Sequence, residues 1–205
     1  MSDYKLLING RMVAGDSTME VINPATEAPV ATCARASKAQ LDQAVAAAKA
    51  AFPAWSKTTI DERRAVLVAM ADAIQANIPE LARLLTQEQG KPLADATGEI
   101  FGCSAFFRYF ASLDLPARVV TDDATSRIEV RRKPLGVVGA IVPWNFPMIL
   151  MAFKVPAALL AGNTVILKPA ATTPLSTLRF AELVKDLVPP ASGSPCCRPA
   201  GRPAP

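Results

Sequence analysis

The clearest succession of structural signals lies in residues 135–174 (LGVVGAIVPWNFPMILMAFKVPAALLAGNTVILKPAATTP). Two short apolar runs rich in β-branched residues, Val137–Val142 and Thr164–Leu167, are typical of strands buried on both faces. The apolar stretch Pro147–Ala161 between them predicts one helix, which Gly162-Asn163 ends as a left-handed cap. A segment of about 30 residues with this pattern predicts a right-handed βαβ unit with parallel strands.

Polar residues follow the carboxyl ends of these two strands. Pro143-Trp144-Asn145 comes after the first strand, and Lys168-Pro169 comes after the second. Ligands of open parallel sheets bind beyond the carboxyl ends of the strands. We therefore expect the two turns to lie side by side and to form the candidate site.

Strand pairs and then helices are predicted before this unit. The strand pairs are Leu6–Val13, around the hairpin signal Asn9-Gly10, and Met19–Ile22 with Pro29–Ala34. The helices are about Ala39–Ala51, Ile60–Ala76, Pro79–Gln89 and Leu93–Leu113. Ser37 with Gln40, and Thr59 with Glu62, have the capping-box spacing. Asn77 is the expected cap of the third helix.

Two segments of different character flank the predicted unit. Arg127–Val138 alternates between polar and apolar residues, which predicts a two-sided ribbon that stands off the domain and offers an edge to a partner. After the amphipathic helix Leu175–Val188, residues Pro189–Pro205 contain six prolines and no acidic residue. This composition predicts a disordered tail without a strand. Its abrupt onset suggests a truncated or out-of-frame end of a longer coding sequence.

Composition excludes several classes of protein. With 205 residues, 51% hydrophobic and 20% charged, the chain can bury a sizeable core. Two of its 22 basic residues, Arg198 and Arg202, lie in the tail, so the body has only a small positive excess, which does not predict nucleic-acid binding. The N-terminus lacks a signal-peptide pattern, so a cytoplasmic location is expected. The apolar stretch Pro147–Ala161 is too short for a membrane span and contains Lys154.

Metal or disulfide chemistry is not predicted either. The chain has no histidine, and of its four cysteines Cys33 and Cys103 are isolated, whereas Cys196-Cys197 are adjacent in the tail. This spacing fits neither a disulfide framework nor a metal site.

Several motifs together resemble the aldehyde dehydrogenase superfamily. They are PWNFP at Pro143–Pro147, Lys154 nine residues after Asn145, and TVILKPA ending in Lys168-Pro169-Ala170. Weaker matches are ING at Ile8–Gly10, INPAT at Ile22–Thr26 and QGKP at Gln89–Pro92. Their order and spacing, from about Leu6 to Val188, make the resemblance specific.

The resemblance implies an α/β fold of the aldehyde dehydrogenase type. Residues 1–125 would form the hairpins and helices of the cofactor-binding domain, and residues 126–138 a β-ribbon oligomerisation arm. Residues 139–188 would form a partial Rossmann-type βαβα unit, the first of a dinucleotide-binding domain, and residues 189–205 the tail. The implied activity is NAD- or NADP-dependent oxidation of an aldehyde to a carboxylic acid through a thioester on a cysteine, in a homo-oligomer.

The resemblance also implies roles for individual residues, each with an alternative. Asn145 would donate a hydrogen bond to the oxyanion, or cap the following helix. Lys154 would support a charge relay, or extend its ammonium into solvent. Lys168 would bind a ribose hydroxyl of the cofactor, or be a solvated strand end. Trp144 would wall the nicotinamide pocket, or belong to the core. Val142 and Pro143 would line the cofactor site with it.

One position departs from the family pattern. Ala171 stands where members often have a glutamate that accepts hydrogen bonds from the adenosine ribose and repels a 2′-phosphate. The choice between NAD and NADP is therefore open, and Thr172 and Thr173 could supply hydroxyl groups instead.

The nucleophilic cysteine and the general-base glutamate of the family would follow this chain. Cys33, in a predicted strand, and Cys103, on an apolar helix, are expected to be inert packing residues. We therefore expect little or no turnover from this chain alone. An alternative is a non-catalytic partner that binds nucleotide or pairs with a complete subunit, and a third is a generic nucleotide-binding α/β module.

Overall fold

The computed structural model describes residues 4–187 and the backbone of residues 196–197. Two hairpins come first, β1 (Leu6–Ile8) with β2 (Arg11–Val13), and β3 (Ser17–Ile22) with β4 (Pro29–Arg35). Four helices follow: α1 (Lys38–Trp55), α2 (Ile60–Ala76), α3 (Ile78–Gln89) and α4 (Leu93–Ala111). The remaining elements are β5 (Arg118–Asp122), β6 (Arg127–Val130), β7 (Val137–Ile141), α5 (Pro147–Ala152), α6 (Val155–Leu160), β8 (Thr164–Lys168), α7 (Leu175–Val184) and β9 (Cys196–Cys197).

Local signals place the first hairpin and the helix starts. Asn9 and Gly10 have positive φ angles of 52° and 72°, as the tight hairpin turn requires. Ser37 and Thr59 each form a complete capping box at the start of α1 and α2. Asn77 occupies the N-cap position of α3, as predicted, but its side chain makes no capping hydrogen bond. Its side-chain amide donates to the Ala73 carbonyl of α2 at 2.8 Å.

The β7–β8 pair is parallel, as the sequence predicts, and Ile141 lies opposite Lys168. The connection between the two strands is not the single predicted helix, because α5 and α6 are separated by a turn at Phe153 and Lys154. Pro156 explains the break, since a proline inside a helix lacks an N–H and clashes with the carbonyl four residues earlier. The chain leaves α6 through Gly162, with a φ of 83°.

A short third strand extends this sheet. β9 pairs in parallel with β8, with Ile166 opposite Cys196, so the strand order is β7-β8-β9. The prediction that residues 189–205 contain no strand is therefore wrong at Cys196–Cys197. The disorder predicted for the other residues of that tail concerns positions outside the described residues.

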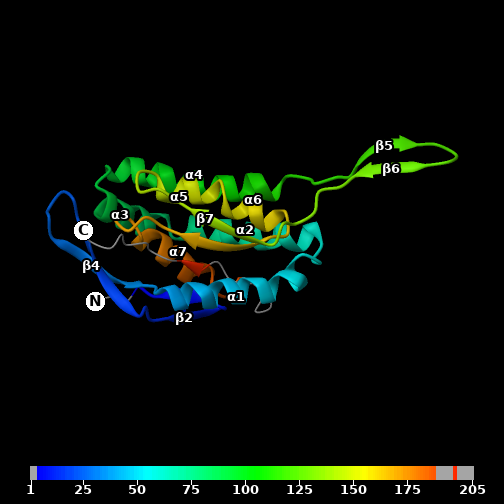
Figure 1. The fold of residues 1–205 in the computed structure, drawn as a ribbon. Helices are drawn as coiled ribbons and strands as arrows, with labels where there is room; N and C mark the ends of the chain where they lie inside the picture. The colour runs from blue at the N-terminus through cyan, green and yellow to red at the C-terminus, as the bar shows by residue number, and fades with distance from the viewer. Residues whose placement is uncertain (1–3, 188–195, 198–205) are drawn as a thin grey trace.

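A two-stranded ribbon of β5 and β6 extends away from the rest of the protein (Figure 1). The predicted ribbon, Arg127–Val138, contains β6 and the first two residues of β7, and it lacks the partner strand β5. That strand comes from residues 118–122, which lie in the segment assigned to the hairpins and helices of residues 1–125. Asp123 organises the turn, because its Oδ1 accepts hydrogen bonds from the amides of Thr125 and Ser126.

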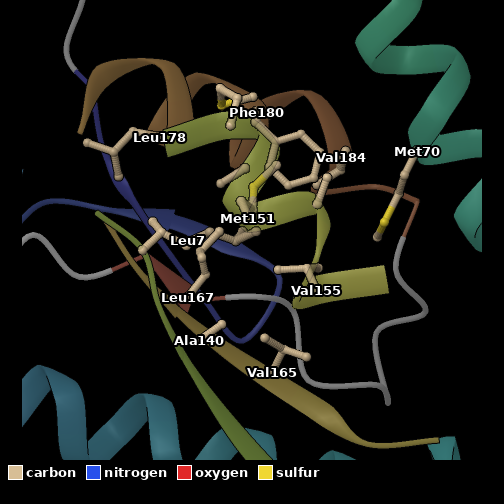
Figure 2. Packing of buried hydrophobic residues seen from close by; sticks show 14 of the residues in the cluster. Leu7, Met70, Ala140, Met151, Val155, Val165, Leu167, Leu178, Phe180 and Val184 are labelled. Atoms are coloured by element: carbon tan, nitrogen blue, oxygen red, sulfur yellow. The ribbon is translucent and has the colours of Figure 1, made fainter. Parts of the chain in front are cut away.

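The core surrounds the β7–β8 sheet. Figure 1 shows α1 on one side of the sheet and α4, α5 and α6 on the other. Side chains from β8, the two crossover helices and α7 meet on this second side, as Figure 2 shows for Leu167, Met151, Val155, Phe180 and Val184. All five side chains are fully buried. Because buried side chains are close-packed, the strands that end at the candidate site are rigidly supported.

Among residues 4–187, no single helix has the length and apolar composition of a membrane span, and only the pair α2 and α3, bent by 72°, would reach that length together. The same part of the chain contains no cluster of three or more potential metal-ligating Cys, Asp or Glu side chains.

Candidate functional site

The two polar turns at the carboxyl ends of β7 and β8 lie side by side. The Val142 amide donates to the Lys168 carbonyl at 3.0 Å, immediately beyond the Ile141–Lys168 pair of the sheet. Val142 itself is buried, Pro143 is half-buried and Trp144 is exposed. The juxtaposition predicted from the sequence is thus confirmed.

Asn145 is exposed beyond the end of β7, and its side chain does not cap α5. The cap position of that helix is Phe146, and it makes no side-chain capping bond. The alternative reading of Asn145 as a helix cap is therefore wrong. Its side-chain amide lies at the carboxyl edge of the sheet, where a hydrogen-bond donor could meet a ligand.

A carboxylate from another helix caps α5 instead. Glu99, in α4, accepts hydrogen bonds through Oε1 from the amides of Met148 (2.9 Å) and Ile149 (3.2 Å). A negative charge at the N-terminus of a helix is favourable because the unpaired amides and the helix dipole both point at it. The other oxygen, Oε2, forms an ion pair with Lys91 Nζ.

Lys91 links this ion pair to the candidate site. Its ammonium also donates to the backbone carbonyl of Asn145 at 3.0 Å and lies 4.0 Å from the centroid of the Phe146 ring. The side chains of Lys91 and Glu99 are only 9% and 1% exposed. Two buried charges are stable only when they are paired and hydrogen-bonded, and the β7–α5 turn supplies part of that bonding.

A second buried carboxylate holds the other turn. Glu88, at the end of α3, accepts hydrogen bonds from the amides of Leu175 (2.5 Å) and Ser176 (3.0 Å) and from the Ser176 hydroxyl. It therefore caps α7, the helix that follows the Lys168-Pro169 turn. Burial raises the pKa of Glu88 to about 7, although these hydrogen bonds act in the opposite direction.

Lys154 lies in the turn between α5 and α6, and its ammonium donates to the Ile141 carbonyl at the end of β7. Lys154 is exposed, but its ammonium is bonded to the end of β7, the strand that leads to Asn145. The alternative that this lysine only extends into solvent is therefore wrong. The break in the crossover helix gives the residue this position. Lys154 and Asn145 thus belong to the same end of β7.

Lys168 lies at the edge of a groove of 850 Å³ between α1 and the sheet. The groove is lined mainly by apolar side chains, among them Leu41, Val45, Ile141 and Ile166. Lys168 is half-buried, and its ammonium donates to the Pro169 carbonyl at 3.2 Å. It is therefore more than a solvated strand end.

Trp144 and Ala171 line a different hollow, of 540 Å³, together with Thr172, Thr173 and residues of β3. Trp144 is 59% exposed, so the alternative that it belongs to the core is wrong. The predicted cofactor residues thus adjoin two hollows: Lys168 faces the groove beside α1, and Trp144 and Ala171 face the cavity beside β3.

The two cysteines described with side chains cannot serve as nucleophiles. Cys33 and Cys103 are free thiols buried in the core. Burial raises the pKa of Cys33 to about 12 and also raises that of Cys103, so neither forms the reactive thiolate near neutral pH. The side chains of Cys196 and Cys197 lie outside the described residues.

Sequence reasoning missed Lys91, Glu99 and Glu88 as parts of the site. The QGKP motif contributed only to the family resemblance. One signal was available for Glu99, which stands directly before Ile100 within the buried stripe of α4. A carboxylate on an apolar face requires a specific partner, but the sequence did not identify that partner.

Comparison with known proteins supports one family. The model of the aldehyde dehydrogenase family matches residues 12–193. The chain is 45% identical, over 170 residues, to 3,6-anhydro-alpha-L-galactose dehydrogenase of Streptomyces coelicolor, and this match covers 82% of the chain and 35% of that protein.

Two solved structures have a closely similar fold. PnpE of Pseudomonas sp. WBC-3, in complex with nicotinamide adenine dinucleotide, matches with a TM-score of 0.90 and 40% identity, over 96% of this chain and 41% of its own. An NADP-dependent enzyme of E. coli matches with a TM-score of 0.91 and 34% identity, over 97% and 42%.

The chain spans between 35% and 42% of the length of these three relatives. The family match covers most of its residues, including both strand-end turns. The protein described here belongs to the aldehyde dehydrogenase family.

Proposed function

We propose that this chain corresponds to the N-terminal portion of an NAD- or NADP-dependent aldehyde dehydrogenase and carries the cofactor side of its active site. The observation that carries the proposal is the hydrogen bond between Val142 and Lys168, which brings the PWN and KP turns to one edge of a parallel sheet. In this interpretation β7, α5, α6, β8 and α7 form the first βαβα unit of a dinucleotide-binding domain.

The residues at this edge fit a nicotinamide dinucleotide. Lys168 lines an apolar groove, where its ammonium can donate to a ribose hydroxyl. Trp144 lines the neighbouring hollow beside β3, and the buried Val142 and half-buried Pro143 connect the end of β7 to it. Ala171, which lines the hollow beside β3, contributes no carboxylate of its own that would repel a 2′-phosphate, so the proposal includes both NAD and NADP. When bound, the cofactor would accept a hydride from the substrate.

The chain's own contribution to the chemistry is electrostatic. The exposed Asn145 side-chain amide donates a hydrogen bond to the aldehyde oxygen as that oxygen becomes negative during attack by a thiolate. Lys154, bonded to the end of β7, places a positive charge at the same edge, where it supports proton transfer in a charge relay. Neither of the cysteines described with side chains supplies that thiolate, since Cys33 and Cys103 are buried with raised pKa values.

Cofactor titration of the purified chain tests this proposal. We expect the chain to bind NAD or NADP. Lys168→Met should weaken this binding at least about tenfold, because a charge-assisted hydrogen bond is lost. Lys38→Met, on the exposed face of α1, should leave the affinity unchanged. Incubation with cofactor and an aldehyde should produce no reduced nicotinamide. Equal affinity of the Lys168→Met and Lys38→Met variants, or turnover by the chain alone, would contradict the proposal.

A second candidate function is that of a non-catalytic partner. The β5–β6 ribbon projects from the body (Figure 1) and exposes Val119, Val120, Ile128 and Val130 by 45–55%, and exposed edges with apolar residues invite pairing. In this reading the ribbon pairs with a second copy or with a complete subunit.

Light scattering tests that association. An Ile128→Glu variant should shift the chain to the monomer, whereas Val68→Glu, at an exposed position of α2, should not. An unchanged mass for Ile128→Glu would exclude the ribbon as the contact.

A further inference from the structure

The turn between β7 and α5 is held at both ends by backbone contacts. At its start, the Val142 amide is bonded to the Lys168 carbonyl. At its end, Glu99 binds the first free amides of α5, those of Met148 and Ile149. Asn145, which stands between these two anchors, has an exposed side chain, so the backbone that carries it is what the rest of the protein holds in place.

Lys91 supplies the contact in the middle of the turn. Its ammonium donates to the Asn145 carbonyl at 3.0 Å, is paired with Glu99 and lies over the Phe146 ring. A bond to this carbonyl fixes the peptide plane between Asn145 and Phe146, because the peptide unit is planar. Together with the anchors at Val142 and at the start of α5, this bond restricts the backbone of Asn145 and thereby the directions open to its Cα–Cβ bond.

We propose that Lys91, held by Glu99, is a positioning residue that fixes the Asn145 side-chain amide for its role as an oxyanion donor. This inference rests on the proposed function for the role of Asn145, and it extends that function to residues of the α3–α4 connection. A donor that is already in place stabilises a developing charge without reorganisation.

The burial of the pair distinguishes this role from that of a surface ion pair. Exposed pairs contribute little because solvent screens them, but Lys91 and Glu99 are 9% and 1% exposed. A buried ammonium must be paired and hydrogen-bonded. One of the acceptors of Lys91 is the backbone carbonyl of Asn145, the candidate catalytic residue. Loss of the ammonium would therefore release the Asn145 carbonyl as well as the Glu99 carboxylate.

Nuclear magnetic resonance of the full chain labelled with ¹⁵N-asparagine tests the inference. The sequence contains five asparagines, Asn9, Asn23, Asn77, Asn145 and Asn163, and an Asn145→Ser variant assigns the signals of interest. In Lys91→Met we expect the backbone and side-chain signals of Asn145 to shift or broaden more than those of the other four. Lys91→Arg, which retains a cation and several donors, should restore them.

Two further variants complete the test. Lys38→Met removes an exposed lysine paired with Asp42 and should leave the Asn145 signals in place. If Lys91→Met does not fold, Glu99→Gln provides the same readout, because it removes the negative partner of Lys91 but keeps an oxygen for the α5 amides. Unchanged Asn145 signals in whichever of these two variants folds would overturn the inference.

These signals are recorded without cofactor. Failure of NAD or NADP to bind would count against the proposed function and would not alter the expected pattern of shifts. A pattern without an Asn145 shift would count against the positioning role alone.

Discussion

Glu88 should make the stability of this chain depend on pH in a direction opposite to that of most carboxylates. Its side chain is 2% exposed, and burial raises its pKa from 4.5 to about 7, with Glu99 adding to the effect. A rise of this size corresponds to about 3 kcal/mol of preference for the protonated form in the folded state.

The sign follows from proton binding in the two states. Below pH 4.5 both the folded and the unfolded chain hold the proton. Between pH 4.5 and about 7 the unfolded chain loses it, whereas the folded chain keeps it on Glu88, so the free energy of unfolding decreases as the pH rises. Above about pH 7 both states are ionised, and this contribution no longer changes.

The Glu88→Gln variant removes this titration. Its amide cannot ionise, and any misfit with the amides of Leu175 and Ser176 adds an offset that does not depend on pH. The free energy of unfolding of Glu88→Gln, relative to the unmodified chain, should therefore increase by about 3 kcal/mol between pH 4.5 and pH 7.

Urea denaturation followed by circular dichroism, repeated across this pH range, measures the difference. Glu27→Gln, at an exposed position in the β3–β4 turn, controls for the loss of a carboxylate as such. Parallel pH profiles for the Glu88→Gln variant and the unmodified chain would refute the reasoning. A relative loss of stability at high pH would show that the hydrogen bonds at the start of α7 outweigh the cost of burial.

Two further outcomes follow from the packing. Gly90→Ala should lower the free energy of unfolding by about 1–3 kcal/mol, because Gly90 has a φ of 93° and a Cβ there would lie 2.7 Å from the Pro24 Cγ. The control Gly98→Ala, in open space on α4, should be neutral or stabilising by up to about 1 kcal/mol. Equal thermal midpoints for the two variants would contradict this prediction. Cys33 and Cys103 should resist iodoacetamide in the native chain and react in urea, as measured by peptide mass mapping, and rapid native labelling of either would disprove their burial.

The strand-end site was predictable because its logic is local. Val137–Val142 and Thr164–Leu167 are recognisable as buried strands, and parallel strands bring their carboxyl ends to one edge, so the neighbourhood of Asn145 and Lys168 follows from pattern alone. The capping boxes at Ser37 and Thr59 were equally accessible, since donor and acceptor lie three residues apart.

Other features depended on contacts that no local pattern encodes. The ribbon strand β5 has few signals of its own and is defined by pairing with β6. β9 consists of two residues in a proline-rich segment and is defined by pairing with β8. Asn77 occupies the N-cap position that its residue type predicts, but the one side-chain contact it makes is with the Ala73 carbonyl of the preceding helix.

The sequence by itself determined the βαβ order, the two polar turns and the family, because strand pattern, turn residues and motif spacing act over short stretches of chain. Only the tertiary structure decided what holds those turns. Lys91 reaches Asn145 across 54 positions, and Glu88 reaches Ser176 across 88. A buried charge takes its partners from whatever segments fold around it, so these residues acquire their role only when α3 and α4 pack against the sheet unit.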